Sequence, residues 1–270
     1  MAIGQTKWSV ALDVSDAEAA AVLEQDRIWS SFMLADLLPP FRAYSRYALA
    51  TRAGSNGHAA CLILQHPAFT VISSYGANAG VAAILAQAAL PKHALIQAQA
   101  QHLPLFERYY RFETNGRELL RMAVSARTFR PPPSAPALPV EQLTRADAAA
   151  LGELYKLYPE AHFHPDQLEH GVFYGLRRDG RLLATGGTHA VAPAYGIAVL
   201  GGIFTHPEAR RQGHATTITA ALVVHLLAQG CRDVVLNVVA ENHLAISVYT
   251  RLGFQAHVRY WTGQGICRED

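Results

Sequence analysis

The feature of this sequence that most restricts its folding is a proline-rich segment near the middle of the chain. Five of the ten residues from 130 to 139, RPPPSAPALP, are proline. Proline has no backbone N–H and a fixed φ, so the segment suits neither a helix interior nor a strand interior. Such segments are extended and fairly stiff connectors. We therefore predict two domains, residues 1–129 and 140–270, with residues 130–139 as the linker.

The composition is that of a chain with enough apolar material for two packed cores. Of its 270 residues, 50% are hydrophobic and 16% are charged, and this length suits two domains of ordinary size. The net charge of +2 is close to neutral. A nucleic-acid binder usually carries a strongly basic surface, so no nucleic-acid partner is expected.

The cysteines and the apolar runs indicate where the protein works. Cys61, Cys231 and Cys267 are far apart and form no CxxC pair, so we expect free thiols in a reducing cytoplasm and no metal site. The N-terminus lacks the long apolar core of a signal peptide. No apolar run approaches the roughly 20 residues needed to cross a membrane. The prediction is a cytoplasmic protein with no membrane partner.

The N-terminal half interleaves helical and strand patterns. Residues 16–38 are rich in alanine and leucine, which predicts one or two helices ending at Pro39-Pro40. The other predicted helices are residues 78–90 and 102–110. The predicted strands are residues 44–51, 59–65, 69–74, 94–99 and 119–124, with a hairpin turn at 54–57. This interleaving favours an α/β or α+β class.

The C-terminal half is more regular. The predicted strands are residues 140–143, 172–177, 182–191, 197–205, 233–239 and 254–261. The predicted helices are residues 145–158, 215–229 and 242–252. In the second helix, Ile218, Leu222 and Leu226 recur at four-residue spacing, which is typical of one buried helix face.

A basic, glycine-containing loop connects a predicted strand to a predicted helix. Its sequence is Arg210-Arg211-Gln212-Gly213-His214-Ala215. The first N–H groups of a helix have no partner within it, and with the helix dipole they suit a phosphate. Gly213 lets the backbone approach an anion, and the two arginines add positive charge. The loop predicts a phosphate site; an ordinary surface loop before a helix is the alternative.

A second segment, residues 241–254, begins with a polar cap and contains a tyrosine. On a helix that starts near Asn242, Ala245 and Tyr249 lie on one face. The Asn242 side chain can cap the helix or bind a ligand amide. Taken alone, the segment is better explained by an N-cap and a core tyrosine.

The two segments together resemble the GNAT superfamily of N-acetyltransferases. The matching motifs are Arg210-x-x-Gly213-x-Ala215 and Asn242-x-x-Ala245-x-x-x-Tyr249-x-x-x-Gly253-Phe254, in the family's order. Thr205-His206-Pro207-Glu208 also looks like the strand end before the family's loop. The resemblance covers residues 140–261, about half of the chain. It implies the acyl-CoA N-acyltransferase fold, with a mixed, mostly antiparallel central sheet.

The resemblance also implies acetyl-CoA, or another acyl-CoA, as the co-substrate. Its pyrophosphate would lie on the loop amides of residues 211–215, and its pantetheine arm would pair with a bulged strand. Gly201-Gly202 fits such a bulge, although the glycines can equally well relieve packing. The implied cofactor-binding residues are Ile203, Phe204, Thr205, Arg210, Arg211, Gln212, Gly213, His214, Ala215, Asn242 and Ala245.

Two residues are the candidates for proton transfer. Tyr249 is the candidate general acid, since a phenol near the sulfur can protonate the leaving thiolate; a tyrosine that only packs on the cofactor is the alternative. His189 is the candidate general base, because its ordinary pKa lies near neutrality. His162, His164 and Glu208 are weaker candidates, and for each histidine a packing or solvated role is the simpler explanation.

These residues predict an N-acetyltransferase that moves an acetyl or other acyl group to a primary amine of a small molecule or peptide. A CoA-binding sensor without turnover is the alternative. The acceptor and the acyl length are not predicted, and a monomer and a homodimer are both open. Residues 74–80 lack basic side chains and could be a degenerate copy of the cofactor loop. The N-terminal half is therefore either a degenerate GNAT-like copy or an unrelated α/β domain.

Overall fold

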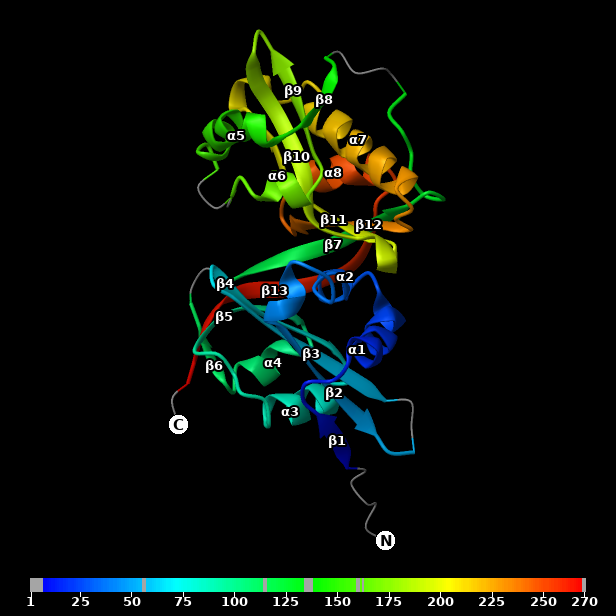
Figure 1. Ribbon diagram of the computed structural model, residues 1–270, viewed down its shortest axis with the longest axis vertical. Helices are drawn as coiled ribbons and strands as arrows, with labels where there is room; N and C mark the ends of the chain where they lie inside the picture. Colours follow the sequence, from blue (N-terminus) through cyan, green and yellow to red (C-terminus); the bar gives the residue numbers. More distant parts are fainter. Residues whose placement is uncertain are drawn as a thin grey trace. The chain divides into compact units, whose positions relative to one another are not determined.

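The computed structural model describes residues 7–54, 57–113, 116–133, 138–158, 161 and 163–268. The chain divides into two compact units. Unit 1 comprises Met1–Arg121 and Val258–Asp270, and unit 2 comprises Met122–His257. Both units combine helices with a largely antiparallel sheet (Figure 1).

Unit 1 contains a mixed sheet with the strand order β1-β2-β3-β4-β5-β13. All neighbouring strands are antiparallel except β4 and β5, which are parallel. A short strand, β6 (Tyr110–Phe112), also pairs with β13. The strands in this order are β1 (Trp8–Ala11), β2 (Ser45–Arg52), β3 (His58–His66), β4 (Phe69–Gly76), β5 (His93–Gln99) and β13 (Gln255–Cys267). The helices of unit 1 are α1 (Asp16–Leu23), α2 (Ser31–Ala35), α3 (Asn78–Leu85) and α4 (Leu103–Phe106), with 3-10 turns η1 (Glu24–Asp26) and η2 (Phe41–Tyr44).

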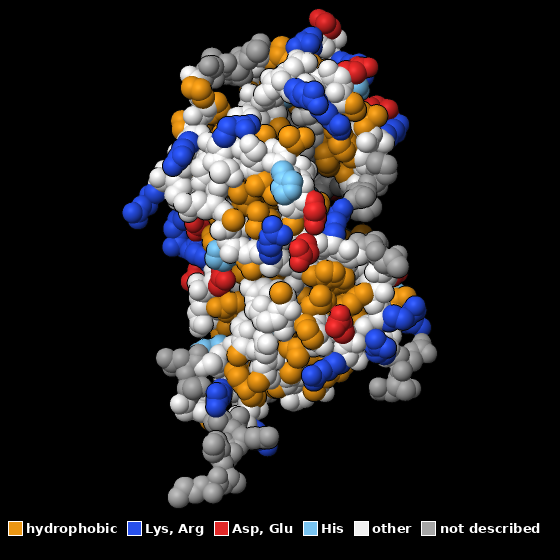
Figure 2. Space-filling view, turned by 180° about the vertical axis from the view of Figure 1, so that it is seen from behind, with side chains coloured by type: hydrophobic (Ala, Val, Ile, Leu, Met, Phe, Trp, Pro, Cys, Tyr) orange, Lys and Arg blue, Asp and Glu red, His pale blue; other side chains and the backbone are white. Residues whose placement is uncertain are grey.

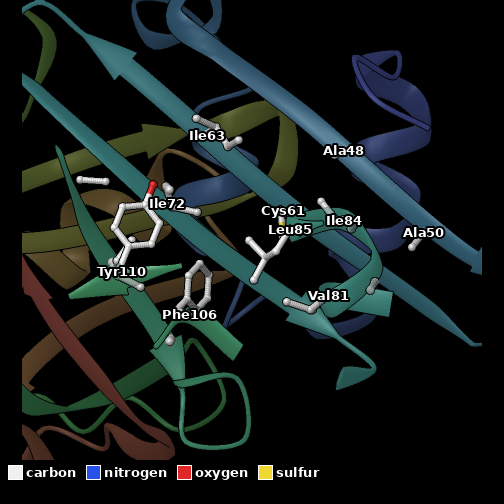
Figure 3. Packing of buried hydrophobic residues seen from close by; sticks show 14 residues of the cluster. Ala48, Ala50, Cys61, Ile63, Ile72, Val81, Ile84, Leu85, Phe106 and Tyr110 are labelled. Atoms are coloured by element: carbon white, nitrogen blue, oxygen red, sulfur yellow. The ribbon is translucent and has the colours of Figure 1, made fainter. Parts of the chain in front are cut away.

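Local sequence signals determine where helix α1 begins and which residues of α3 are buried. Ser15 caps α1 through a reciprocal arrangement: its hydroxyl accepts from the Glu18 N–H, and the Glu18 carboxylate accepts from the Ser15 N–H at 3.0 Å. Helix α3 is predominantly apolar and connects the parallel strands β4 and β5. Its Val81, Ile84 and Leu85 pack onto buried strand residues in the core of unit 1 (Figure 3).

Unit 2 repeats this plan with the strand order β7-β12-β11-β10-β9-β8. The neighbouring strands β11 and β12 are parallel, whereas β8–β9, β9–β10 and β10–β11 are antiparallel. The strands are β7 (Arg117–Ser125), β8 (Val140–Leu143), β9 (Phe173–Arg178), β10 (Arg181–Ala192), β11 (Ile197–Thr205) and β12 (Asp233–Val239). The helices are α5 (Ala148–Tyr155), α6 (Gln167–His170), α7 (His214–Ala228) and α8 (His243–Arg251), with 3-10 turns η3 (Arg145–Asp147), η4 (Pro193–Tyr195) and η5 (Pro207–Ala209).

The two units therefore share one topology. In each, four strands form an antiparallel meander, a helix crosses to a parallel fifth strand, and a short helix follows (Figure 1). This confirms the predicted mixed, mostly antiparallel fold and is consistent with an N-terminal copy of it. The sixth strand of each unit comes from the other half of the chain, since β13 pairs with β5 and β7 neighbours β12.

This strand pairing makes the compact units differ from the predicted domain ranges. Residues 122–129 belong to unit 2, and residues 258–270 belong to unit 1. The reason is that a strand packs with its hydrogen-bonding partners, whichever side of a linker it lies on in the sequence.

Several elements also differ from their predicted ranges. The predicted helix 102–110 is only α4, because Tyr110 begins β6. The last strand continues from the predicted residue 261 to Cys267, through Gly263 and Gly265, which pair with β5. A Cβ on Gly263 would lie 2.5 Å from the Trp261 ring, so this site has no room for a side chain. The short elements β1, β6 and α6 were not predicted.

The surface of the described chain is mixed in character. Basic and acidic side chains are interspersed on the face shown in Figure 2, in keeping with the near-neutral net charge. Among the helices of the described residues, none combines the length and the apolar character that a membrane span needs.

Candidate active site

The candidate site of unit 2 begins where β11 and β12 separate. These parallel strands pair only from Ile197 to Leu200 on β11 and from Asp233 to Leu236 on β12. Beyond this point β11 continues to Thr205 and β12 to Val239 without pairing with each other, while β11 still pairs with β10. Gly202, with φ at +60°, lies just after the last pair. The structure thus shows two strands whose facing edges are free of each other at their carboxyl ends, where α/β sheets commonly bind ligands.

The predicted phosphate loop follows β11 after the 3-10 turn η5. Arg211 and Gly213 both have positive φ, +63° and +80°, and α7 begins at His214. The first hydrogen bond of the helix runs from the Thr217 N–H to the Gly213 carbonyl at 3.0 Å. The N–H groups of residues 214–216 therefore have no acceptor within the helix. A Cβ on Gly213 would have no atom within 4 Å, so the loop is open above this residue.

The side chains of the loop divide into exposed and buried groups. Arg210, Arg211 and Gln212 are exposed. The Arg210 guanidinium donates to the Tyr158 hydroxyl at 3.4 Å. His214 is 5% exposed, and burial, followed by the charge of Arg178, lowers its pKa. His214 is thus placed to offer its backbone N–H rather than its ring to a ligand.

A surface cavity of about 320 Å³ lies beside the start of this loop. Its charged groups are partly paired, since Arg181 donates to Glu208 at 3.2 Å. Glu208 itself is exposed, with 75% of its side chain accessible. The cavity is lined by Arg178, Asp179, Arg181, Leu183, Glu208 and Ala209.

Helix α8 carries the second predicted motif. The Asn242 side-chain oxygen accepts from the Ala245 N–H at 3.1 Å, so Asn242 is the N-cap. This leaves the amide NH₂ as the part of Asn242 that can contact a ligand. Tyr249 lies one turn after Ala245 and is 8% exposed. Burial raises its pKa to about 12, so its hydroxyl stays protonated at neutral pH.

The structure places His189 next to the bent part of β11. His189 lies at a register shift of β10, between Thr188 and Ala190. A Cβ on Gly201 would lie 1.8 Å from His189 Nε2, so the ring rests directly on that glycine. Part of His189 is exposed to solvent, but the protein atoms around its ring desolvate the imidazole and lower its pKa. A neutral imidazole can accept a proton.

The weaker candidates for a base lie elsewhere. His164 has 73% of its side chain exposed and lies 3.2 Å from Asp166. Glu208 pairs with Arg181 on the surface. His162 lies outside the described residues. Among the candidates that lie in the described residues, only His189 is seen to contact the bent segment of β11.

An aromatic cluster, which the sequence did not predict, covers one face of this strand. The Tyr158 ring stacks on the Phe204 ring with centroids 4.2 Å apart. The Tyr155 ring meets Phe204 edge-on at 5.0 Å, and Phe163 lies 5.1 Å from Tyr155. The Tyr158 hydroxyl donates to the Thr205 carbonyl. Helical spacing between Tyr155 and Tyr158 was the only sequence signal, and it does not reveal what the rings contact.

Unit 1 contains a corresponding separation of strands, but a histidine bridges it. Strands β4 and β5 pair at Val71–Ser73 and Leu95–Gln97 and then separate. His102 follows the end of β5 by three residues, as Asn242 follows the end of β12. Its fully buried ring lies 2.9 Å from the Ser74 hydroxyl and 2.9 Å from the Gly76 carbonyl. Nε2–H donates to the carbonyl, so Nδ1 accepts from Ser74.

The loop after β4 is filled as well. A Cβ on Gly80, in the first turn of α3, would lie 2.6 Å from the Ala59 side chain and 2.7 Å from the Trp8 ring. In unit 2 the corresponding loop is open above Gly213. Gly80 is thus packed against protein, whereas Asn78 and Ala79, the first two residues of α3, are exposed.

The described part of the chain offers few other side chains for catalysis or metal binding. Cys61 and Cys231 are buried free thiols, and Cys267 is half-buried and free. Within the described ranges, no group of three or more His, Cys, Asp or Glu side chains is arranged to hold a metal ion.

Comparison with known proteins identifies the fold of unit 2. Residues 140–254 match the acetyltransferase (GNAT) family, so this part of the chain is a GNAT domain. The mycothiol acetyltransferase of Actinosynnema mirum is 46% identical over 57 residues. That match covers 20% of this chain and 19% of the relative, so the similar part spans about a fifth of the relative's length.

Solved structures extend the likeness to both units. A Drosophila protein from a structural genomics programme superposes with a TM-score of 0.71 at 15% identity, over 95% of this chain and 98% of that one. A tandem GNAT protein from the clavulanic acid biosynthesis pathway superposes with a TM-score of 0.58 at 13% identity, over 98% of this chain and 100% of that one. At these identities the likeness concerns the fold, and it is consistent with two GNAT-like units in this chain.

Proposed function

We propose that the protein is an acyl-CoA-dependent N-acyltransferase that moves an acetyl group to a primary amine of a small molecule or peptide. The observation that carries this proposal is the separation of β11 from β12, followed along the chain by an open loop that leads into α7. Free strand edges, free helix N–H groups and a buried tyrosine then lie on consecutive elements of a GNAT domain. The acetyl transfer in the name of the mycothiol acetyltransferase supports the same reaction class.

The residues present fit acetyl-CoA as a co-substrate. The N–H groups of residues 211–215 and the α7 dipole would hold the pyrophosphate, with Arg210 and Arg211 adding charge. The free edge of Ile203–Thr205 would pair with amides of the pantetheine arm. The Asn242 amide and Ala245 would contact that arm from α8.

The reaction is an aminolysis by direct attack in a ternary complex. The amine nitrogen forms a bond to the thioester carbonyl carbon, and the C=O π pair moves onto oxygen. When that pair returns, the C–S bond breaks and its electrons leave with sulfur. Tyr249 gives its proton to this thiolate, and His189, directly or through a water, takes the proton that the amine nitrogen loses. Solvent then returns both residues to their starting states.

The proposal is tested by titration with acetyl-CoA and by a thiol-release assay on a panel of primary amines. We expect one acetyl-CoA bound per chain and thiol release with at least one amine. Binding without release on any amine would favour the alternative, a CoA-binding sensor without turnover. Absence of binding would refute both.

A glycine pair tests the phosphate loop. Gly213→Ala places a methyl group over the open loop and is expected to weaken acetyl-CoA binding roughly tenfold, by displacing one or two charge-assisted hydrogen bonds. Gly230→Ala is the matched control at the other end of α7, because Gly230 also has a positive φ (+87°) and open space around its Cβ position. Both variants carry a similar backbone cost. Calorimetric titration of both should show weaker binding in Gly213→Ala alone; equal affinities would place the phosphate elsewhere.

We further propose that unit 1 binds no CoA, because His102 bridges its separated strands. Burial lowers the pKa of His102 below its ordinary value of 6.5. As the pH falls through about 6.5, the unfolded chain takes up this proton before the folded chain does. The histidine contribution to stability is therefore present above that pH and lost below it.

His102→Asn removes this titration and should make the free energy of unfolding of unit 1 less dependent on pH between about 7.5 and 5.5. Urea unfolding followed by tryptophan fluorescence is a suitable measurement, because Trp8, Trp29 and Trp261 all lie in unit 1. An identical pH dependence in both proteins would show that the ring is not desolvated as described.

A cytoplasmic location and a monomeric or homodimeric state remain predictions from the sequence.

A further inference from the structure

Tyr155 is a buried tyrosine at the end of α5 that reaches the bent part of β11. It is 9% exposed, and its ring packs between Phe163 and Phe204. Aromatic contacts on two sides hold the ring in one orientation. The hydroxyl position is therefore set by packing rather than by a flexible loop.

The hydroxyl lies against the glycine at which β11 has left β12. A Cβ built on Gly202 would lie 2.1 Å from the Tyr155 hydroxyl oxygen, so the hydroxyl occupies the space of a side chain there. Gly202 also has φ at +60°, which disfavours any other residue. The close hydroxyl and the positive φ thus both keep residue 202 free of a side chain. The absence of a side chain lets the hydroxyl reach the strand backbone.

The Tyr155 hydroxyl has no hydrogen-bond partner among the residues that the structure describes. Buried tyrosine hydroxyls usually have one, and those of the buried residues Tyr47 and Tyr110 do. Tyr47 donates to the Met33 carbonyl and Tyr110 to the Pro91 carbonyl. Burial raises the pKa of Tyr155 to about 12, so the group remains a donor at neutral pH. A protonated hydroxyl on a nine-tenths buried tyrosine, without an acceptor among the described residues, points to a ligand atom as its partner.

We propose that the Tyr155 hydroxyl donates a hydrogen bond to the carbonyl oxygen of the acyl group bound beside Gly202. This inference rests on the proposed function, because that function supplies the thioester. During attack, the carbonyl π pair moves onto oxygen and the hydrogen bond strengthens, without transfer of the tyrosine proton. Preorganised donors of this kind stabilise the charge that develops in the transition state. Tyr249 separately protonates sulfur, so the two tyrosines have different roles in one reaction.

The acceptor amine is not needed to test this role. The probes are CoA and S-(2-oxopropyl)-CoA, a stable ketone analogue that presents a carbonyl oxygen but cannot be cleaved. Tyr155→Phe keeps the ring and its packing and removes only the donor. We expect it to bind CoA as the wild type does and to lose about three- to tenfold in affinity for the ketone. With a ¹³C-labelled ketone, the bound carbonyl stretch should move to higher frequency in the variant.

Tyr174→Phe is the matched control. The Tyr174 hydroxyl lies 3.0 Å from His225 Nδ1, away from the proposed reacting atoms, so its removal also costs one hydroxyl contact. It should leave the ketone-to-CoA affinity ratio and the carbonyl frequency unchanged. If the ratio and frequency are also unchanged in Tyr155→Phe, this inference is wrong while the proposed function stands. If the wild type binds neither probe, the proposed function itself fails.

Discussion

Tyr249→Phe is expected to lower kcat about 100-fold, at the modest end of what a general acid contributes. The reason is that the C–S bond must then break without a proton donor for sulfur. The hydroxyl of Tyr249 is buried on α8 and protonated at neutral pH, because burial raises its pKa to about 12. The measurement is steady-state thiol release with the most active amine of the panel.

Two controls separate proton donation from packing. The phenylalanine ring keeps the contact with Phe254, whose centroid lies 5.9 Å from that of Tyr249, so the free energy of unfolding should change little. The dissociation constant for acetyl-CoA, measured by calorimetry, should also stay near the wild-type value. An unchanged kcat would show that Tyr249 only packs on the co-substrate.

Phe254→Ala is expected to reduce the free energy of unfolding by about 3–5 kcal/mol, the range for deleting a buried phenylalanine ring. Phe254 is 2% exposed. It follows Gly253, whose positive φ of +91° turns the chain away from the end of α8. Removal of its ring leaves a cavity beside Tyr249, so activity should fall as well. Urea unfolding followed by circular dichroism measures the loss.

Leu244→Ala is the control for this substitution. Leu244 is also apolar and lies on α8, but it is 84% exposed. Its removal should change the free energy of unfolding by no more than about 0.5 kcal/mol. Tryptophan fluorescence, which reports unit 1, provides a second comparison within each variant. A loss below about 1 kcal/mol in Phe254→Ala would mean that the site collapses around the missing ring.

The elements that carry the cofactor loop were predictable because their signals are local. Strands β8, β11 and β12 have the predicted bounds, 140–143, 197–205 and 233–239. Strands β11 and β12 are mostly apolar runs, and such runs are recognisable without knowing their neighbours. The loop was recognisable because positive φ at Gly213 and a helix start leave a local signature. Helix α3 ends at Leu85 rather than Leu90, since an alanine-rich pattern does not show where packing stops.

Contacts between distant residues were not predictable. His102 lies 28 residues from Ser74 in the sequence, and no motif links them. Tyr155 and Gly202 are likewise brought together only when α5 packs against the sheet and the Tyr155 side chain reaches β11. His189 was singled out because a histidine titrates near neutrality, but its contact with Gly201 depends on the register shift in β10.

The sequence by itself predicted the class of fold and an acyl-CoA donor, through two motifs whose residues form a loop and a helix start. Those signals can be recognised in a short segment, because they arise from the hydrogen bonding and the φ preferences of neighbouring residues. Only the tertiary structure decided that the sixth strand of each unit, β13 in unit 1 and β7 in unit 2, comes from the other half of the chain. It also decided that one strand separation is bridged by His102 and the other is lined by Tyr155. Pairing and packing act between residues far apart in the chain, and the pattern of a single segment does not encode them.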